Sequence, residues 1–82
     1  MSDTIRATIV QTINKIRVDS GREPVTPDDQ ETLTGGMGLD SLDLAVLVVS
    51  LEKELGVDPF RDGTASARTL GELVSVYKQA AA

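Results

Sequence analysis

The feature that most constrains the fold is the spacing of aliphatic residues, which recur every three or four positions in three separate segments. This spacing puts them on one face of a helix and predicts amphipathic helices over residues 3–17, 41–55 and 69–79. The stripes comprise Ile5, Ile9, Ile13 and Ile16, then Leu44, Leu47, Val48, Leu51 and Leu55, and finally Leu70, Leu73, Val74 and Tyr77. No segment shows the alternating pattern of a strand. The sequence therefore predicts an all-α fold, a small bundle of three or four helices.

Local signals mark the ends of these helices. Asp40 and Asp43 have the spacing of an N-terminal capping pair, and Gly56 stands where a glycine often ends a helix. Thr69 and Glu72 match the capping box T-x-x-E at the start of the last helix. Residues 60–68 contain a glycine and several small residues, so they predict at most a short fourth helical turn.

A long segment without helical spacing, residues 19–39, separates the first two helices. Its four glycines and two prolines predict a loop, and Val25 and Leu33 are expected to hold this loop to the core. Loops longer than about 12–15 residues are uncommon in compact domains and are often functional. The acidic charge gathers in and just after this loop, because residues 19–43 hold seven acidic side chains and one arginine.

Composition excludes several classes of function. The chain has 82 residues, which fits one domain over residues 1–82, and it has neither histidine nor cysteine. It therefore lacks the commonest general base, the thiol nucleophile and most zinc ligands, so no enzymatic activity is expected. A net charge of −5 argues against nucleic-acid binding and favours basic partners. The chain has neither a run of about 18 apolar residues nor a signal-peptide pattern at its start, so a cytoplasmic protein without a membrane span is expected.

The segment GLDSLDL, residues 38–44, places one hydroxyl group, that of Ser41, at the boundary between the long loop and the second helix. A helix N-terminus presents unpaired N–H groups and a partial positive charge, which favour a phosphate ester attached there. An alternative is an ordinary helix start with Asp40 as its cap. The two interpretations are compatible, because a capped helix start is also a rigid support for a modified serine.

The chain's size, acidity and helix order, together with the segment GLDSLDLAVLVVSLEKELG over residues 38–56, resemble the acyl carrier protein family. The resemblance implies that Ser41, the serine of the D-S-L motif, receives 4′-phosphopantetheine from coenzyme A through a separate phosphopantetheinyl transferase that uses magnesium. The thiol at the end of this arm would carry acyl groups as thioesters and would supply the thiol that the chain lacks. The implied carrier is a monomer and not an enzyme. Its other partners would be acyl-loading, condensing or acyltransferase enzymes.

The cargo is less well defined by sequence. Carriers of amino acids usually have Gly-Gly-His-Ser or Gly-Gly-Asp-Ser around the serine, and Gly35-Gly36 lies too far upstream to match that pattern. An acyl cargo is therefore preferred, with a peptidyl or aminoacyl carrier as the alternative. A third interpretation is an unmodified helical interaction module. The pathway, whether fatty acid, polyketide or another product, stays open.

One position departs from the family pattern. Many members have an acid five residues after the serine, where this chain has Val46. Helical geometry places Leu42, Ala45, Val46 and Val49 on a face turned away from the core stripe. The valines either widen the core or form an exposed strip that docks partner enzymes, with the nearby acids steering the encounter. The residues to which this second interpretation assigns partner recognition are Asp40, Leu42, Asp43, Val46 and Val49.

Overall fold

The computed structural model describes residues 3–61 and 66–81 and contains three helices in that range. These are α1 (Asp3–Asp19), α2 (Ser41–Leu55) and α3 (Leu70–Ala81). The described residues form no strand, only one isolated bridge between Thr32 and Thr69, so the predicted all-α class is confirmed. The centre of the fourth helical turn expected over 60–68 lies outside the described residues, and the described parts of that segment are not helical. Among the described helices, none is long and apolar enough to cross a membrane.

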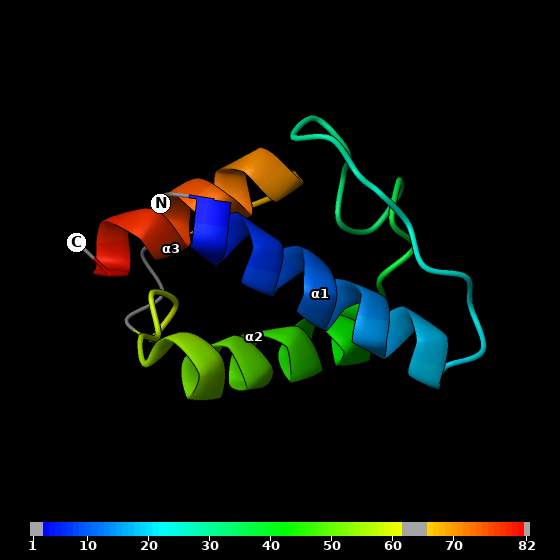
Figure 1. The fold of residues 1–82 in the computed structure, drawn as a ribbon, viewed down its shortest axis with the longest axis horizontal. Helices are drawn as coiled ribbons and strands as arrows, with labels where there is room; N and C mark the ends of the chain where they lie inside the picture. The colour runs from blue at the N-terminus through cyan, green and yellow to red at the C-terminus, as the bar shows by residue number, and fades with distance from the viewer. Residues whose placement is uncertain (1–2, 62–65, 82) are drawn as a thin grey trace.

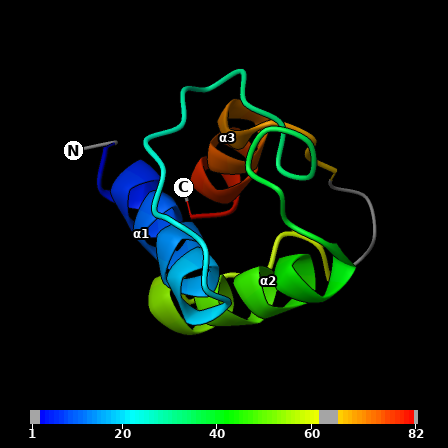
Figure 2. The same ribbon diagram turned by 90° about the vertical axis from the view of Figure 1, so that its right-hand side faces the viewer.

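Helix α1 is the central element of the bundle. It packs against both α2 and α3, and Figure 1 shows it between the two other helices. Viewed from the side in Figure 2, the long loop leaves the end of α1, passes the start of α3 and returns to the start of α2. The loop therefore contacts the start of α3 on its way from the end of α1 to the start of α2.

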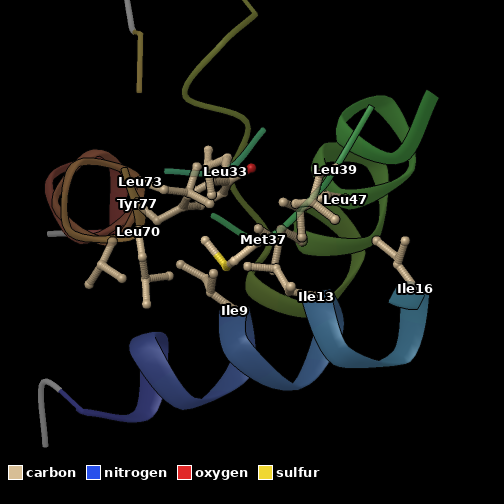
Figure 3. Packing of buried hydrophobic residues seen from close by; sticks show 12 residues of the cluster. Ile9, Ile13, Ile16, Leu33, Met37, Leu39, Leu47, Leu70, Leu73 and Tyr77 are labelled. Carbon is tan, nitrogen blue, oxygen red and sulfur yellow. The ribbon is translucent and has the colours of Figure 1, made fainter. Parts of the chain in front are cut away.

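The core contains the predicted helical stripes and an additional contribution from the loop. Its buried residues on the helices are Ile9, Ile13, Ile16, Leu47, Leu51, Leu70, Leu73, Val74 and Tyr77. The loop adds Leu33, Met37 and Leu39, which pack among the helical side chains (Figure 3). The expected role of Leu33 is confirmed, and Val25 is partly buried against the core as predicted. Met37 and Leu39 follow no helical spacing, so periodicity could not assign them to the core.

The first helix ends two residues later than residue 17, where the sequence pattern placed its end. Gly21 adopts a left-handed conformation with φ of 82°, and its N–H donates to the carbonyl of Val18 at 3.0 Å. The N–H of Arg22 donates to the carbonyl of Arg17 at 2.8 Å, which completes a Schellman motif. The glycine, counted in the sequence as a loop residue, is thus the stop signal of α1.

The other helix signals are confirmed, although α3 ends at Ala81 rather than at residue 79. Gly56 has φ of 75°, and its N–H donates to Glu52 O at 2.8 Å at the end of α2. At the start of α3, the N–H of Glu72 donates to Thr69 Oγ1 at 3.2 Å, and Glu72 Oε1 accepts from the amide of Thr69 at 3.4 Å. This is the reciprocal pairing of a capping box.

Side chains of α1 hold the long loop along its length. Asn14 Nδ2 donates to Val25 O, and Asn14 Oδ1 accepts from Val25 N, both at 2.8 Å. The side-chain amide thus pairs with the backbone of Val25 as a neighbouring strand would. Arg6 donates to Pro27 O and to Asp29 Oδ1, both at 3.1 Å. Farther along, Leu33 N donates to Arg68 O at 2.8 Å on the segment before α3. The loop therefore satisfies its backbone groups through contacts distant in sequence rather than through regular structure of its own.

Candidate functional site

Ser41 is the first residue of α2 and is exposed. Asp40 caps the helix in an extended conformation: its Oδ1 accepts from Asp43 N at 2.8 Å, and Asp43 Oδ2 accepts from Asp40 N at 3.2 Å. The predicted capping pair is thus a complete capping box. The capping box does not use the amides of Ser41 and Leu42, which both lie in the first turn. These are the amide groups that favour an anion at a helix start.

The residues just before the serine alternate between buried and exposed. Met37 and Leu39 are buried, whereas Gly38 and Asp40 are exposed. Gly38 has φ of 68°, a left-handed conformation that glycine adopts without the penalty of a Cβ. The N–H of Leu39 donates to Leu33 O at 3.0 Å, so the chain is anchored two residues ahead of Ser41. The exposed hydroxyl therefore stands on a segment that is fixed by burial on one side and by a cap on the other.

Two arginines at the end of α1 fix this segment, and the sequence patterns did not predict their role. Arg22 donates to Gly38 O, to Asp43 Oδ2 at 2.8 Å and to Ser20 Oγ at 2.9 Å. Arg17 donates to Met37 O and to Glu23 O, the latter at 2.8 Å. A signal was present for Arg22, because it is the one basic side chain among the acids of residues 19–43. The sequence held no such signal for Arg17, because a basic residue near the end of a helix is common.

The contacts of Asp43 favour its charged form. The hydrogen bond from Arg22 is the largest cause that lowers the pKa of Asp43, followed by the hydrogen bond from the amide of Asp40. Both interactions favour the charged carboxylate over the neutral acid. The capping box is therefore maintained as a charged group well into the acidic range.

Acidification is expected to destabilise the protein partly through Asp43. Its pKa is lower folded than unfolded, so its contribution is fully present above the unfolded pKa and is lost as the pH falls through the folded pKa. Urea unfolding at a series of pH values should show a steeper acid loss for wild type than for Asp43→Asn. Parallel curves for the two proteins would contradict this role. Asp19→Asn, an exposed change at the end of α1, is the matched control and should follow wild type.

One face of α2 is apolar and exposed, and we call Leu42, Ala45, Val46 and Val49 the α2 strip. The exposed fractions are 71% for Leu42, 44% for Val46 and 52% for Val49, and Ala45 is also exposed. The strip is turned away from the core, as helical geometry predicted, so the interpretation that the valines widen the core is wrong. Asp40 and Asp43 lie at its N-terminal end.

The opposite side of α2 borders an apolar hollow with a volume of about 140 Å³. Its walls are Leu33, Leu44, Leu47, Val48, Phe60, Ala67 and Leu73. A larger hollow, about 340 Å³, shares Leu33, Leu44 and Ala67 with it and extends to the polar residues Thr32, Thr34 and Arg68. Leu44 follows Ser41 by three residues and lies on the same side of the helix. The two hollows thus share three lining residues, and one of these, Leu44, lies about one turn along α2 from Ser41.

These features fit a phosphopantetheine group. An exposed hydroxyl at a helix start suits the phosphate end, and the apolar hollow beside α2 suits an apolar group carried at the other end. No curated protein and no solved structure gives a match to the chain. The comparison with protein families matches residues 7–76, most of the chain, to the family described as the phosphopantetheine attachment site. Members carry covalently attached 4′-phosphopantetheine, cooperate with a phosphopantetheinyl transferase and with biosynthetic enzymes, and are carriers without catalytic activity of their own. The chain therefore belongs to the acyl carrier protein family of phosphopantetheine carriers.

Proposed function

We propose that Ser41 is the residue that bears the arm and that the cargo is an acyl group held as a thioester. The observation that carries this proposal is the position of the Ser41 hydroxyl: it is exposed, it stands on a capped helix start, and it lies about one turn before Leu44, which lines the hollow. It is also the serine of the D-S-L segment within the matched residues. The other serine of α2, Ser50, lies nine residues farther along the helix, away from its start.

The roles of the chain's own groups follow from this assignment. When bound, the group supplies a terminal thiol, which forms and exchanges thioesters. Ser41 Oγ would form one new bond to phosphorus as the pyrophosphate bond of coenzyme A breaks and adenosine 3′,5′-bisphosphate leaves. The proton of the hydroxyl passes to a base of the transferase, so no base of this chain is required. Asp40, Asp43 and Arg22 keep the first turn of α2 in place. Leu44 and the other lining residues offer the cargo an apolar surface.

An acyl cargo is favoured over an aminoacyl one by the chemistry of the inner hollow. All of its lining residues are apolar. A free α-amino group is charged at neutral pH and would lose its hydration there without a partner, whereas an alkyl chain gains from burial. A peptidyl or aminoacyl carrier is the second candidate. The pathway to which the acyl group belongs stays open.

The proposal is tested by incubating the purified chain with coenzyme A, magnesium and a promiscuous phosphopantetheinyl transferase. Intact mass should increase by one phosphopantetheinyl group, and peptide mapping should place this group on Ser41. An unchanged mass would contradict the carrier function. The acyl groups released by hydroxylamine from protein isolated from its native cell would then identify the cargo, and an amino acid among them would favour the second candidate.

The α2 strip and the two acids at its start are proposed as the surface that partner enzymes recognise. The residues concerned are Asp40, Leu42, Asp43, Val46 and Val49. Each aliphatic side chain that becomes fully buried in such a contact contributes about 1.5–3 kcal/mol before the costs of association. The acids carry charge that a basic partner surface would attract. The strip therefore supports recognition by apolar contact, with charge at one end.

Val46→Glu should slow the reaction of the loaded carrier with its native partner about tenfold or more, because a charge would be buried against an apolar surface. Folding and arm attachment should stay near wild type, since the side chain is exposed. Gln11→Glu, on the exposed face of α1, adds the same charge elsewhere and is the control. The measurement is kcat/KM of the partner enzyme for each carrier. An unchanged kcat/KM for Val46→Glu would contradict the proposed surface.

Two expectations from the sequence stay predictions. One is that residues 1–82 form a single domain, and the other is that the carrier is a cytoplasmic monomer.

A further inference from the structure

Among the residues that the structure describes, one buried side-chain polar group has no hydrogen-bond partner. Tyr77 on α3 is 0% exposed, and its hydroxyl forms no hydrogen bond with any described residue. The remaining buried residues of the described chain are hydrocarbon side chains and one methionine. Figure 3 shows the Tyr77 hydroxyl as the single oxygen among the core side chains. A phenylalanine would fill the same space without burying a polar group, so the hydroxyl has a cost that packing does not explain.

The hydroxyl is poised to donate a hydrogen bond rather than to ionise. Burial, together with the smaller effects of the negative charges of Asp58 and Glu52, raises the pKa of Tyr77 to about 12. The group therefore keeps its proton at any physiological pH. A neutral phenol of this kind can donate to a carbonyl or hydroxyl oxygen.

Tyr77 lies directly behind the inner wall of the apolar hollow. Phe60 lines the hollow, and its ring meets the Tyr77 ring edge-on, with centroids 6.0 Å apart and an angle of 66° between the planes. Leu73, which precedes Tyr77 by one turn of α3, lines the hollow as well. Tyr77 therefore contacts a residue that lines the hollow without lining the hollow itself.

Phe60 is the part of this wall best placed to move. It belongs to the segment after α2, outside every described helix, and it is partly exposed. Its backbone therefore lies outside any helical ladder, and its amide donates to Asp58 Oδ1 at 3.3 Å. A turn of the ring toward solvent would remove the side chain that stands between the hollow and Tyr77. The hollow would then end in a hydrogen-bond donor instead of a hydrocarbon wall.

We propose that the Tyr77 hydroxyl is a specificity-determining donor that selects a short oxygenated acyl cargo, one whose chain bears a keto group that reaches past Phe60. This inference rests on the proposed function and names the class of its cargo. A cavity of about 150 Å³ accommodates a benzene molecule, so a hollow of about 140 Å³ suits a chain of about six carbons. A saturated chain would leave the hydroxyl unpaired. A keto oxygen would pair with it and would lose little by leaving water.

The experiment compares hexanoyl, 3-oxohexanoyl and 5-oxohexanoyl groups, each transferred with its arm from the corresponding coenzyme A thioester. The thermal midpoint of each loaded protein is measured for wild type and for Tyr77→Phe. In wild type, one of the two oxo forms should melt about 4–8 °C above the hexanoyl form, as expected for one buried hydrogen bond in a domain of this size. In Tyr77→Phe this difference should vanish, and the protein without an arm should be at least as stable as wild type.

Ser75→Ala removes an exposed hydroxyl from the same helix and should retain the wild-type difference. An oxo form no more stable than the hexanoyl form in wild type would overturn the inference. So would an advantage that persists in Tyr77→Phe. A chain that takes no arm at all would instead contradict the proposed function, which the mass spectrum of the same samples reveals before any melting is measured.

Discussion

Replacing Ser41 with alanine is expected to abolish attachment of the phosphopantetheine arm, because the Oγ atom is the one that would bond to phosphorus. The fold should survive, since Ser41 is exposed and the cap of α2 is made by Asp40 and Asp43 rather than by the serine. The change in the free energy of unfolding should therefore stay within about 0.5 kcal/mol. Intact mass after incubation with coenzyme A, magnesium and a transferase should remain that of the unmodified chain.

Ser50→Ala is the matched control for this result. Ser50 lies on the same helix and is only partly exposed, so its loss should leave arm attachment at the wild-type level. Circular dichroism melting of both variants would show that any loss of modification is not a loss of folding. If the Ser41→Ala protein still gained the arm, the attachment site would have to be another hydroxyl. That result would also remove the basis for relating the hollow to the cargo.

The support beneath Ser41 illustrates what sequence could and could not predict. The helix start was predictable because capping depends on residues three apart, and Asp40 and Asp43 bear the pattern themselves. The contacts of Arg17 and Arg22 with the carbonyls of Met37 and Gly38 were not, since any carbonyl can accept and nothing in a sequence marks which one will. The serine was thus identifiable from local signals, whereas the contacts that hold it in place depend on the tertiary fold.

The same distinction applies to the core and to α2. The exposure of Val46 and Val49 followed from the angular spacing of a helix once the core stripe was known. Met37 and Leu39 belong to a loop with no period, so only the folded path of that loop places them inside. Tyr77 was predictable as a core residue from its spacing. Its unpaired hydroxyl was not, because satisfaction of a polar group depends on every neighbour around it.

Leu51→Ala should have the largest effect on stability. Leu51 is 0% exposed on α2 and packs within the single core. Truncation of a fully buried leucine costs about 2–5 kcal/mol through lost burial and the cavity left behind. A chain of this size has a free energy of unfolding of only about 4–12 kcal/mol, so the variant should lose much of its stability.

Val49→Ala provides the comparison for Leu51→Ala, because the two positions are two residues apart on the same helix and Val49 is 52% exposed. It should cost well under about 1 kcal/mol, since little buried surface is lost. Urea unfolding followed by circular dichroism, fitted with a common m-value, measures both changes. Equal losses for the two variants would mean that α2 presents its faces differently from this structure. A large loss confined to Leu51→Ala would support a helix that stabilises the bundle with one face and leaves the α2 strip free for partners.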